Sequence, residues 1–250
     1  MVVPLRPRRR VGPAGNVMTR PPEKIAAGVY RVDAIRFPNA INVLLLENDD
    51  GWTLVDTGVE SEAARIREAL TALSSGPEDL KRIFLTHHHA DHIGGLEGLK
   101  EWASDAEIGA TEYEALVISG KLPPAPPTNP ILRRMANQES MPTTPVGKIL
   151  REGDLVSGFR IVSTPGHSLG HASLLREADG LLFTADAFGC LPRKIRVGVR
   201  KVLCTDPQMA KHSAQKLLHE RFATVIMAHG PVLRSDARAR LQRVLERSRY

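Results

Sequence analysis

The chain is poor in cysteine and in aromatic residues, and it contains no long hydrophobic run. Its 250 residues include 4% aromatics and only two cysteines, Cys190 and Cys204. Two cysteines outside any CxxC pair exclude a disulfide framework and predict reduced thiols in a cytoplasmic protein. The lack of an apolar run of roughly 18–20 residues argues against a membrane-spanning helix. The length and the apolar fraction of 42% allow a large hydrophobic core without covalent crosslinks.

The excess of positive charge is confined to the N-terminus. The formal net charge is +6, but residues 1–22 contain five arginines and no acidic residue, whereas the rest of the chain has 29 basic and 28 acidic residues. The same 22 residues include five prolines and show no apolar periodicity, so we expect a disordered basic tail. Residues 23–250 are expected to form a single domain. Its nearly neutral charge does not indicate a nucleic-acid partner.

Apolar patterning predicts strands with helices between and after them, in two halves. Strands are expected within 28–56, where 48–51 is a hairpin turn, and at 81–86, 106–110, 159–163, 171–175, 181–184 and 223–227. Helices are expected at 61–73, 93–102, 112–118, 207–221 and 234–247. Residues 119–146 hold seven prolines, which exclude continuous regular structure and leave room for a short helix at 131–138. The order of elements favours two sheets packed face to face with helices outside.

The most informative segment is Thr86-His87-His88-His89-Ala90-Asp91-His92. It places four imidazoles and one carboxylate directly after the predicted strand at 81–86. Side chains alternate in direction along a strand, so His87 and His89 are expected on one side and His88 on the other. Imidazole nitrogen and carboxylate oxygen are both ligands of zinc. The segment therefore predicts part of a metal site.

Three more ligand-type residues stand just after predicted strands: His167, Asp186 and His229. If those strands run side by side, the loops that follow them meet at one edge of the sheets. The expected cavity then contains seven ligand-type side chains: His87, His89, Asp91, His92, His167, Asp186 and His229.

This set of motifs closely resembles the metallo-β-lactamase superfamily. The resemblance rests on His87-x-His89-x-Asp91-His92, Gly166-His167, Asp186 and His229 in this order, with Asp56-Thr57-Gly58 upstream. It extends roughly from Val29 to Leu245. The fold that it implies is α/β, namely the αβ/βα four-layer sandwich, with two mixed β-sheets and helices on the outer faces. A metal centre would lie between the two halves.

The resemblance also implies the roles of the site residues. His87, His89 and His167 would hold a first metal ion, Asp91, His92 and His229 a second, and Asp186 would bridge the two. The implied cofactors are two divalent metal ions, with zinc favoured over manganese and iron. A hydroxide that bridges the metals would attack a substrate carbonyl. As the catalytic residue, Asp91 would orient the hydroxide and pass a proton to the leaving group.

Other residues have two readings each. Asp56 is predicted to accept a hydrogen bond from a ligand histidine, which would orient the ring, and the alternative is a plain turn residue. His171 is expected either to be structural or to orient a ligand in the same way. The basic run from Arg193 to Lys201 follows Asp186. It either lines the mouth of the site or forms a solvated loop.

The leading functional hypothesis is a metal-dependent hydrolase of an ester, thioester or lactone. Glyoxalase II-like thioesterases share the THHHxDHxGG pattern but carry a further helical domain, whereas only about 20 residues follow His229 here. Lactonase-like members resemble this chain better in length and in the PGHSxGH segment. The alternative is a mononuclear iron enzyme of the persulfide dioxygenase type, for which seven ligands are too many. The near-neutral charge of residues 23–250 argues against a nuclease. The full set of seven ligand-type residues argues against a non-catalytic binding protein. We expect a small-molecule substrate, no nucleic acid and no membrane, and leave open whether the protein is a monomer or a homodimer.

Overall fold

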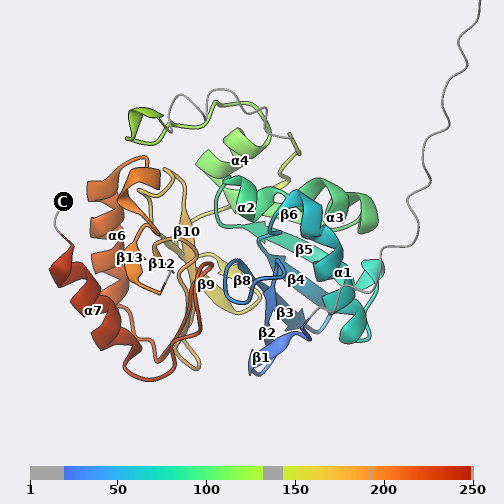
Figure 1. Ribbon diagram of the computed structural model, residues 1–250. Coiled ribbons are helices and arrows are strands. Elements are labelled where there is room, and N and C mark those ends of the chain that lie inside the picture. The colour runs from blue at the N-terminus through green and yellow to red at the C-terminus, as the bar shows by residue number, and fades with distance from the viewer. Residues whose placement is uncertain (1–19, 132–142, 192, 249–250) are drawn as a thin grey trace, which may run out of the picture.

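The structure is a computed structural model that describes residues 20–131, 143–191 and 193–248, in which the strands form two large sheets and a small ribbon (Figure 1). The seven-stranded sheet follows sequence order: β1 (Glu23–Ala26), β2 (Val29–Asp33), β3 (Asn42–Asn48), β4 (Gly51–Val55), β5 (Leu80–Leu85), β6 (Glu107–Thr111) and β7 (Lys148–Leu150). The five-stranded sheet has the order β14 (Thr224–Ile226), β11 (Leu181–Phe183), β10 (Ala172–Arg176), β9 (Phe159–Ser163) and β8 (Leu155–Val156). The ribbon pairs β12 (Phe188–Cys190) with β13 (Ile195–Val197).

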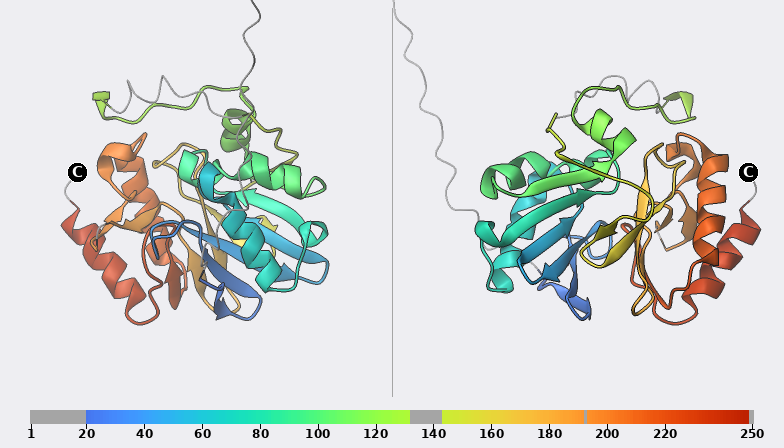
Figure 2. Two further views of the ribbon diagram at one scale, coloured as in Figure 1. Left: turned by 45° about the vertical axis from the view of Figure 1, so that its right-hand side comes forward. Right: turned by 180° about the vertical axis from the view of Figure 1, so that it is seen from behind.

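Helices lie on the outer faces of the two sheets (Figure 2). The α-helices are α1 (Ala63–Ala72), α2 (Ala90–Ile93), α3 (Leu96–Trp102), α4 (Glu112–Ile118), α6 (Pro207–His219) and α7 (Ala237–Arg247). The short 3-10 helices are η1 (Glu60–Glu62), η2 (Pro77–Asp79) and η3 (Lys201–Leu203). In the ranges described, no helix has both the length and the apolar composition to cross a bilayer.

Three separate hydrophobic cores show that the domain has four layers. Along β3, Val43 and Leu45 belong to the core beneath α1 and α3, whereas Leu44 and Leu46 belong to the core between the sheets. This division follows from the alternation of side chains along a strand that is covered on both faces. A third core lies between the five-stranded sheet and helices α6 and α7. Both sheets contain parallel and antiparallel pairs, as predicted.

Most expected elements are present, with one helix wrong and several strands missed. The helix expected at 93–102 is two helices, α2 and α3, that are interrupted at Gly94 and Gly95. A Cβ atom on Gly94 would lie 2.7 Å from the backbone nitrogen of Glu60, so the turn needs glycine to pack this closely. Strands β1, β7, β8, β12 and β13 are too short to give a clear apolar pattern. Residues 1–19 of the expected tail and residues 132–138 of the expected short helix lie outside the described residues.

The start of α6 confirms the predicted cap. The side chain of Asp206 accepts hydrogen bonds from the backbone N–H groups of Gln208 and Met209, both at 2.9 Å, and Pro207 occupies the first turn. Such a cap satisfies donors that have no partner within the helix. It fixes the N-terminus of α6 beside Gly166, where a Cβ atom would overlap the backbone of Ala210. Close packing against α6 therefore accounts for the glycine before His167.

Candidate metal centre

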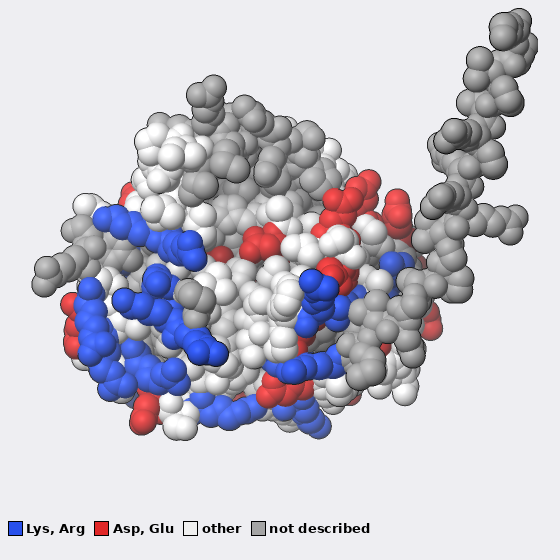
Figure 3. Space-filling view, in the orientation of Figure 1, with Lys and Arg blue, Asp and Glu red and all other residues white. Residues whose placement is uncertain are grey.

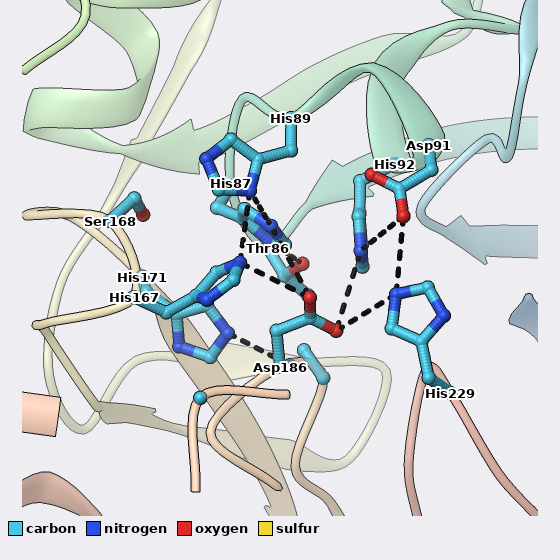
Figure 4. Close-up of polar contacts among 12 residues, drawn as sticks. Thr86, His87, His89, Asp91, His92, His167, Ser168, His171, Asp186 and His229 are labelled. Atoms are coloured by element: carbon cyan, nitrogen blue, oxygen red, sulfur yellow. Dashed lines mark hydrogen bonds and ion pairs between the residues drawn. The ribbon is translucent and has the colours of Figure 1, made fainter. Parts of the chain in front are cut away.

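The seven ligand-type side chains predicted from the sequence come together at one edge of the sandwich (Figure 4). Strands β9, β11 and β14 run in the same direction, because β9 and β11 are both antiparallel to β10 and β14 is parallel to β11. Their carboxyl ends therefore carry His167, Asp186 and His229 to one edge. The facing sheet adds the loop after β5, which contains His87 and His89, and helix α2, which contains Asp91 and His92.

Three imidazoles form the first group of donor atoms. Nε2 of His87 lies 3.1 Å from Nδ1 of His89, which in turn lies 2.9 Å from Nε2 of His167. Two of the three rings are buried, and His89 is half-buried. The nitrogens converge on a common point from two different sheets. This arrangement could hold a metal ion with a tetrahedral preference and one open position.

A second group consists of Asp91, His92 and His229. The Oδ2 atom of Asp91 lies 3.2 Å from Nε2 of His229 and 4.0 Å from Nε2 of His92. The Asp91 side chain is 37% exposed, whereas those of His92 and His229 are 1% and 6% exposed. This second group could also hold a metal ion, and its carboxylate is the one that solvent reaches.

Asp186 lies between the two groups and offers one oxygen to each. Its Oδ2 atom is 3.2 Å from Nε2 of His167, in the first group. Its Oδ1 atom is 3.5 Å from Nε2 of both His92 and His229, in the second group. The carboxylate is thus placed to link two ions.

Two buried polar atoms of the centre have no hydrogen-bond partner among the described residues: Nε2 of His92 and Oδ1 of Asp186. Buried polar atoms are almost always paired, because an unpaired one keeps its desolvation penalty. Both atoms face the same space, and both are of kinds that bind transition metals. The donor set therefore fits divalent metal ions.

Outer hydrogen bonds fix the orientation of the rings in the second group. Nδ1 of His92 donates to Oδ2 of Asp56 over 2.8 Å, and Nδ1 of His229 donates to the carbonyl of Ala40 over 2.6 Å. In the neutral ring, which is the form that binds a metal ion, a proton on Nδ1 leaves the lone pair of Nε2 directed into the centre. Asp56 also accepts hydrogen bonds from the backbone N–H and the hydroxyl of Thr86.

His171 also lies beside the centre, where it contacts the backbone of Asp186 and the side chain of Thr164. Its Nε2 atom accepts a hydrogen bond from the N–H of Asp186 over 3.0 Å, and its Nδ1 atom lies 2.8 Å from the hydroxyl of Thr164. Burial, together with nearby His167, lowers the pKa of His171 to about 3. The neutral ring holds Asp186 in place without carrying charge.

Burial sets the charge of two histidines in the first group, His87 and His89. It lowers the pKa of His87 well below the usual range, and the neighbouring rings of His92 and His89 lower it further. It also lowers the pKa of His89, with His167 acting in the same direction. A metal ligand must be neutral imidazole. Both rings are therefore ready to donate a lone pair at neutral pH.

The carboxylates dominate the electrostatics of the second group. Burial raises the pKa of Asp186, but the imidazoles of His229, His92 and His167 outweigh it and hold this pKa well below the usual value. Burial lowers the pKa of His229, but Asp186 and Asp91 raise it to about 10. The carboxylates therefore attract positive charge to this end of the centre, whether proton or metal.

The structure adds one buried residue that the sequence did not point to, Glu114. His88 is absent from the groups of converging donors, and its Nδ1 atom lies 2.6 Å from Oε2 of Glu114, which also accepts from the His88 N–H. The other oxygen accepts hydrogen bonds from the Ser168 hydroxyl and the Gly170 N–H. Glu114 is fully buried. It therefore ties the loop after β5 to the loop that carries His167.

Comparison with known proteins gives the family. The family described as the metallo-beta-lactamase superfamily matches residues 36–224. The chain belongs to this superfamily. Its four-layer α/β sandwich is confirmed by solved structures, among them metallo-beta-lactamase SMB-1 bound to 2-mercaptoethanesulfonate, with a TM-score of 0.69, 18% identity and coverage of 91% of this chain and 95% of that one. At this identity the likeness concerns the fold alone.

Relatives by sequence include hydrolases of this superfamily. The chain is 26% identical over 218 residues to the uncharacterized protein YobT of Bacillus subtilis, covering 84% of this chain and 91% of that protein. It is 33% identical over 161 residues to the probable metallo-hydrolase YybB of Bacillus subtilis, covering 62% and 64%. It is 30% identical over 161 residues to hydroxyacylglutathione hydrolase of Cereibacter sphaeroides, covering 60% of this chain and 53% of that enzyme. The chain thus spans about half the length of that hydrolase.

Proposed function

We propose that this protein is a hydrolase of an ester, thioester or lactone that works with two divalent metal ions. One ion would be held by His87, His89 and His167, the other by Asp91, His92 and His229, and Asp186 would link the two. The observation that carries the proposal is the position of Asp186, whose two oxygens face different groups of donors at 3.2 and 3.5 Å. A site for one metal would not need a carboxylate placed in this way.

Metal ions held there would lower the pKa of a bound water molecule to about 7 and polarise a substrate carbonyl. The remaining chemistry falls to Asp91, which is the accessible carboxylate of the centre. Burial raises its pKa, but His92 and the hydrogen bond with His229 outweigh this and hold the pKa below the usual value. Asp91 is therefore ionised at neutral pH and able to accept a proton and pass it on.

The donor set and the relatives narrow the range of metals and substrates. Imidazole and carboxylate donors suit zinc, and they accept manganese or iron as well. The match to hydroxyacylglutathione hydrolase supports a small-molecule substrate with a hydrolysable acyl group. Because the match covers only 53% of that enzyme, a substrate screen has to decide among ester, thioester and lactone.

Metal quantification combined with a substrate screen tests the proposal. Purified protein should contain about two zinc ions per chain and hydrolyse at least one compound in a panel of aryl esters, thioesters and lactones. His89→Ala should lose metal and activity, whereas Asp179→Asn, at an exposed ion pair with Arg176, should keep both. One iron per chain with oxygen consumption would favour the dioxygenase alternative. Full hydrolysis by His89→Ala would show that the proposed site is wrong.

A further inference from the structure

The basic run from Arg193 to Lys201 forms one wall of a hollow on the protein surface. Its other wall is α7, which packs against β13. The hollow has a volume of about 620 Å³, and seven of its eleven lining residues are arginine or lysine. None of the described residues that line it is acidic. In Figure 3, blue side chains gather over the side of the molecule where α7 and the β12–β13 ribbon lie.

Three of the four arginines of α7 share one face of the helix. Arg240, Arg243, Val244 and Arg247 recur at the spacing that places residues on a single helical face. The opposite face carries Leu241 and Leu245, which are buried in the core beneath. Packing of that apolar face against the sheet thus fixes the direction in which the arginines project.

The arginines of this face have no carboxylate partner within the described part of the chain. No Asp or Glu oxygen lies within ion-pair distance of Arg240, Arg243 or Arg247, whereas Arg31, Arg82, Arg160 and Arg176 all form ion pairs elsewhere. The one acidic residue of α7, Glu246, is exposed and accepts a hydrogen bond from Gln242. Like charges three and four residues apart on a helix repel. A bound anion would relieve that repulsion.

The hollow also has an apolar part. Ile195, Val197 and Val244 line it together with the cations. Ile195 and Val244 pack on the core that lies under α6 and α7. The arginine near them, Arg196, donates hydrogen bonds from Nη1 to the carbonyls of Leu191 and Lys194, which holds the loop of the ribbon in shape. The hollow therefore presents an apolar surface next to the guanidinium group of Arg196, which these hydrogen bonds hold in position.

We propose that this hollow binds an organic diphosphate or triphosphate, such as a nucleoside diphosphate, at a site distinct from the metal centre. Guanidinium groups bind phosphoryl oxygens through paired hydrogen bonds, and the apolar side chains suit a planar base. The volume lies in the range of small-molecule pockets. A concave site of this size suits a single small molecule better than a bilayer or a duplex. The near balance of charge outside the N-terminal segment also argues against a general polyanion surface.

Isothermal titration calorimetry on the full-length, metal-loaded protein tests this site, with ADP, pyrophosphate, inorganic phosphate and adenosine as probes. ADP should bind with a stoichiometry of one and should bind more tightly than phosphate or adenosine alone. The double variant Arg240→Gln/Arg243→Gln should weaken ADP binding by at least about tenfold, because it removes charge-assisted hydrogen bonds. The affinity should fall as ionic strength rises.

Two matched variants separate this site from general charge and from the metal centre. Arg67→Gln/Arg151→Gln removes the same charge outside the hollow and should leave ADP binding unchanged. His89→Ala should also leave it unchanged, which keeps failure of this site apart from failure of the proposed hydrolase. Equal ADP binding by Arg240→Gln/Arg243→Gln and wild type would overturn the inference. So would binding of short duplex DNA or anionic vesicles without any binding of ADP.

Discussion

Asp56 and His92 form a buried pair in which Nδ1 of the imidazole donates to Oδ2 of the carboxylate over 2.8 Å. Asp56 has a φ of 62°, a left-handed conformation that few residues other than glycine, asparagine and aspartate adopt readily. This backbone conformation, at the end of β4, turns the carboxylate toward the loop after β5. The pair therefore links the end of β4 to His92 in α2, one of the ligand-type residues of the centre.

Substitution of Asp56 by Asn should weaken metal binding without unfolding the protein. Asn tolerates the same positive φ, so the backbone keeps its shape, but the charge that holds the His92 ring is lost. Loss of such an outer hydrogen bond typically lowers metal affinity or activity by about 10–100-fold. Competition with a chromophoric chelator would measure the affinity, and circular dichroism would check the fold.

The control for this substitution is Asp33→Asn, which changes a carboxylate whose ion pair is with Arg31 at the start of the same sheet. Its metal affinity should match that of the wild-type protein. An Asp56→Asn protein that retains wild-type affinity would mean that Asp56 is a plain turn residue, the alternative reading of the sequence.

The sequence predicted the candidate ligands because each depends on a local pattern. A strand that ends before His87 fixes the sides on which His87, His88 and His89 project, whatever the rest of the chain does. The partner of His88 could not be predicted in this way. Glu114 is 26 residues away on α4, and only the packing of α4 brings it to the loop. The only sequence feature that could have pointed to Glu114 is its place in a mostly apolar helical segment. Helix periodicity alone does not distinguish a buried carboxylate from an exposed one.

The basic hollow illustrates the same limit. The run from Arg193 to Lys201 and the arginines of α7 were both visible in the sequence, but they lie about 45 residues apart. Their meeting depends on the contact between β13 and α7, and β13 is a three-residue strand too short to give an apolar pattern. The break between α2 and α3 was likewise hidden, because the need for Gly94 arises from its approach to Glu60.

Glu114→Gln should destabilise the protein and loosen the metal centre together. The fully buried carboxylate accepts four hydrogen bonds, from the N–H and ring of His88, the Ser168 hydroxyl and the Gly170 N–H. A Gln amide presents one acceptor and one donor group, so at least one buried donor loses its partner. Such a loss costs about 1–3 kcal/mol in the free energy of unfolding. Urea denaturation would measure it.

The matched control is Glu112→Gln, an exposed glutamate at the start of the same helix. It should change the free energy of unfolding by no more than about 0.5 kcal/mol. Equal stability of Glu112→Gln and Glu114→Gln would contradict the role of Glu114 as a link between the two loops.

Metal affinity should rise with pH across the neutral range. In the metal-free centre, the carboxylates raise the pKa of His229 to about 10 despite burial, so the ring carries a proton at pH 7. A metal ion binds only the neutral ring and must displace that proton. The apparent affinity should therefore increase by up to about tenfold per pH unit for each displaced proton, and weaken as the pH falls. Metal-binding titrations at several pH values in unbuffered and buffered solutions would count the protons released. An affinity that does not change between about pH 6 and pH 8 would contradict the raised pKa.

The two cysteines should differ sharply in reactivity in the folded protein. Burial, together with nearby Asp186, raises the pKa of Cys204 to about 12, and the Sγ atom lies 3.7 Å from the carbonyl oxygens of Gly198 and Arg200. Relative to a thiol with a pKa of 9.0, the reactive thiolate is about a thousandfold scarcer at neutral pH. Cys190 is only half-buried. With a disulfide reagent such as DTNB, Cys190→Ser should therefore react slowly until denaturant is added, whereas Cys204→Ser should react readily. Rapid labelling of Cys190→Ser without denaturant would show that the interior around Cys204 opens to solvent.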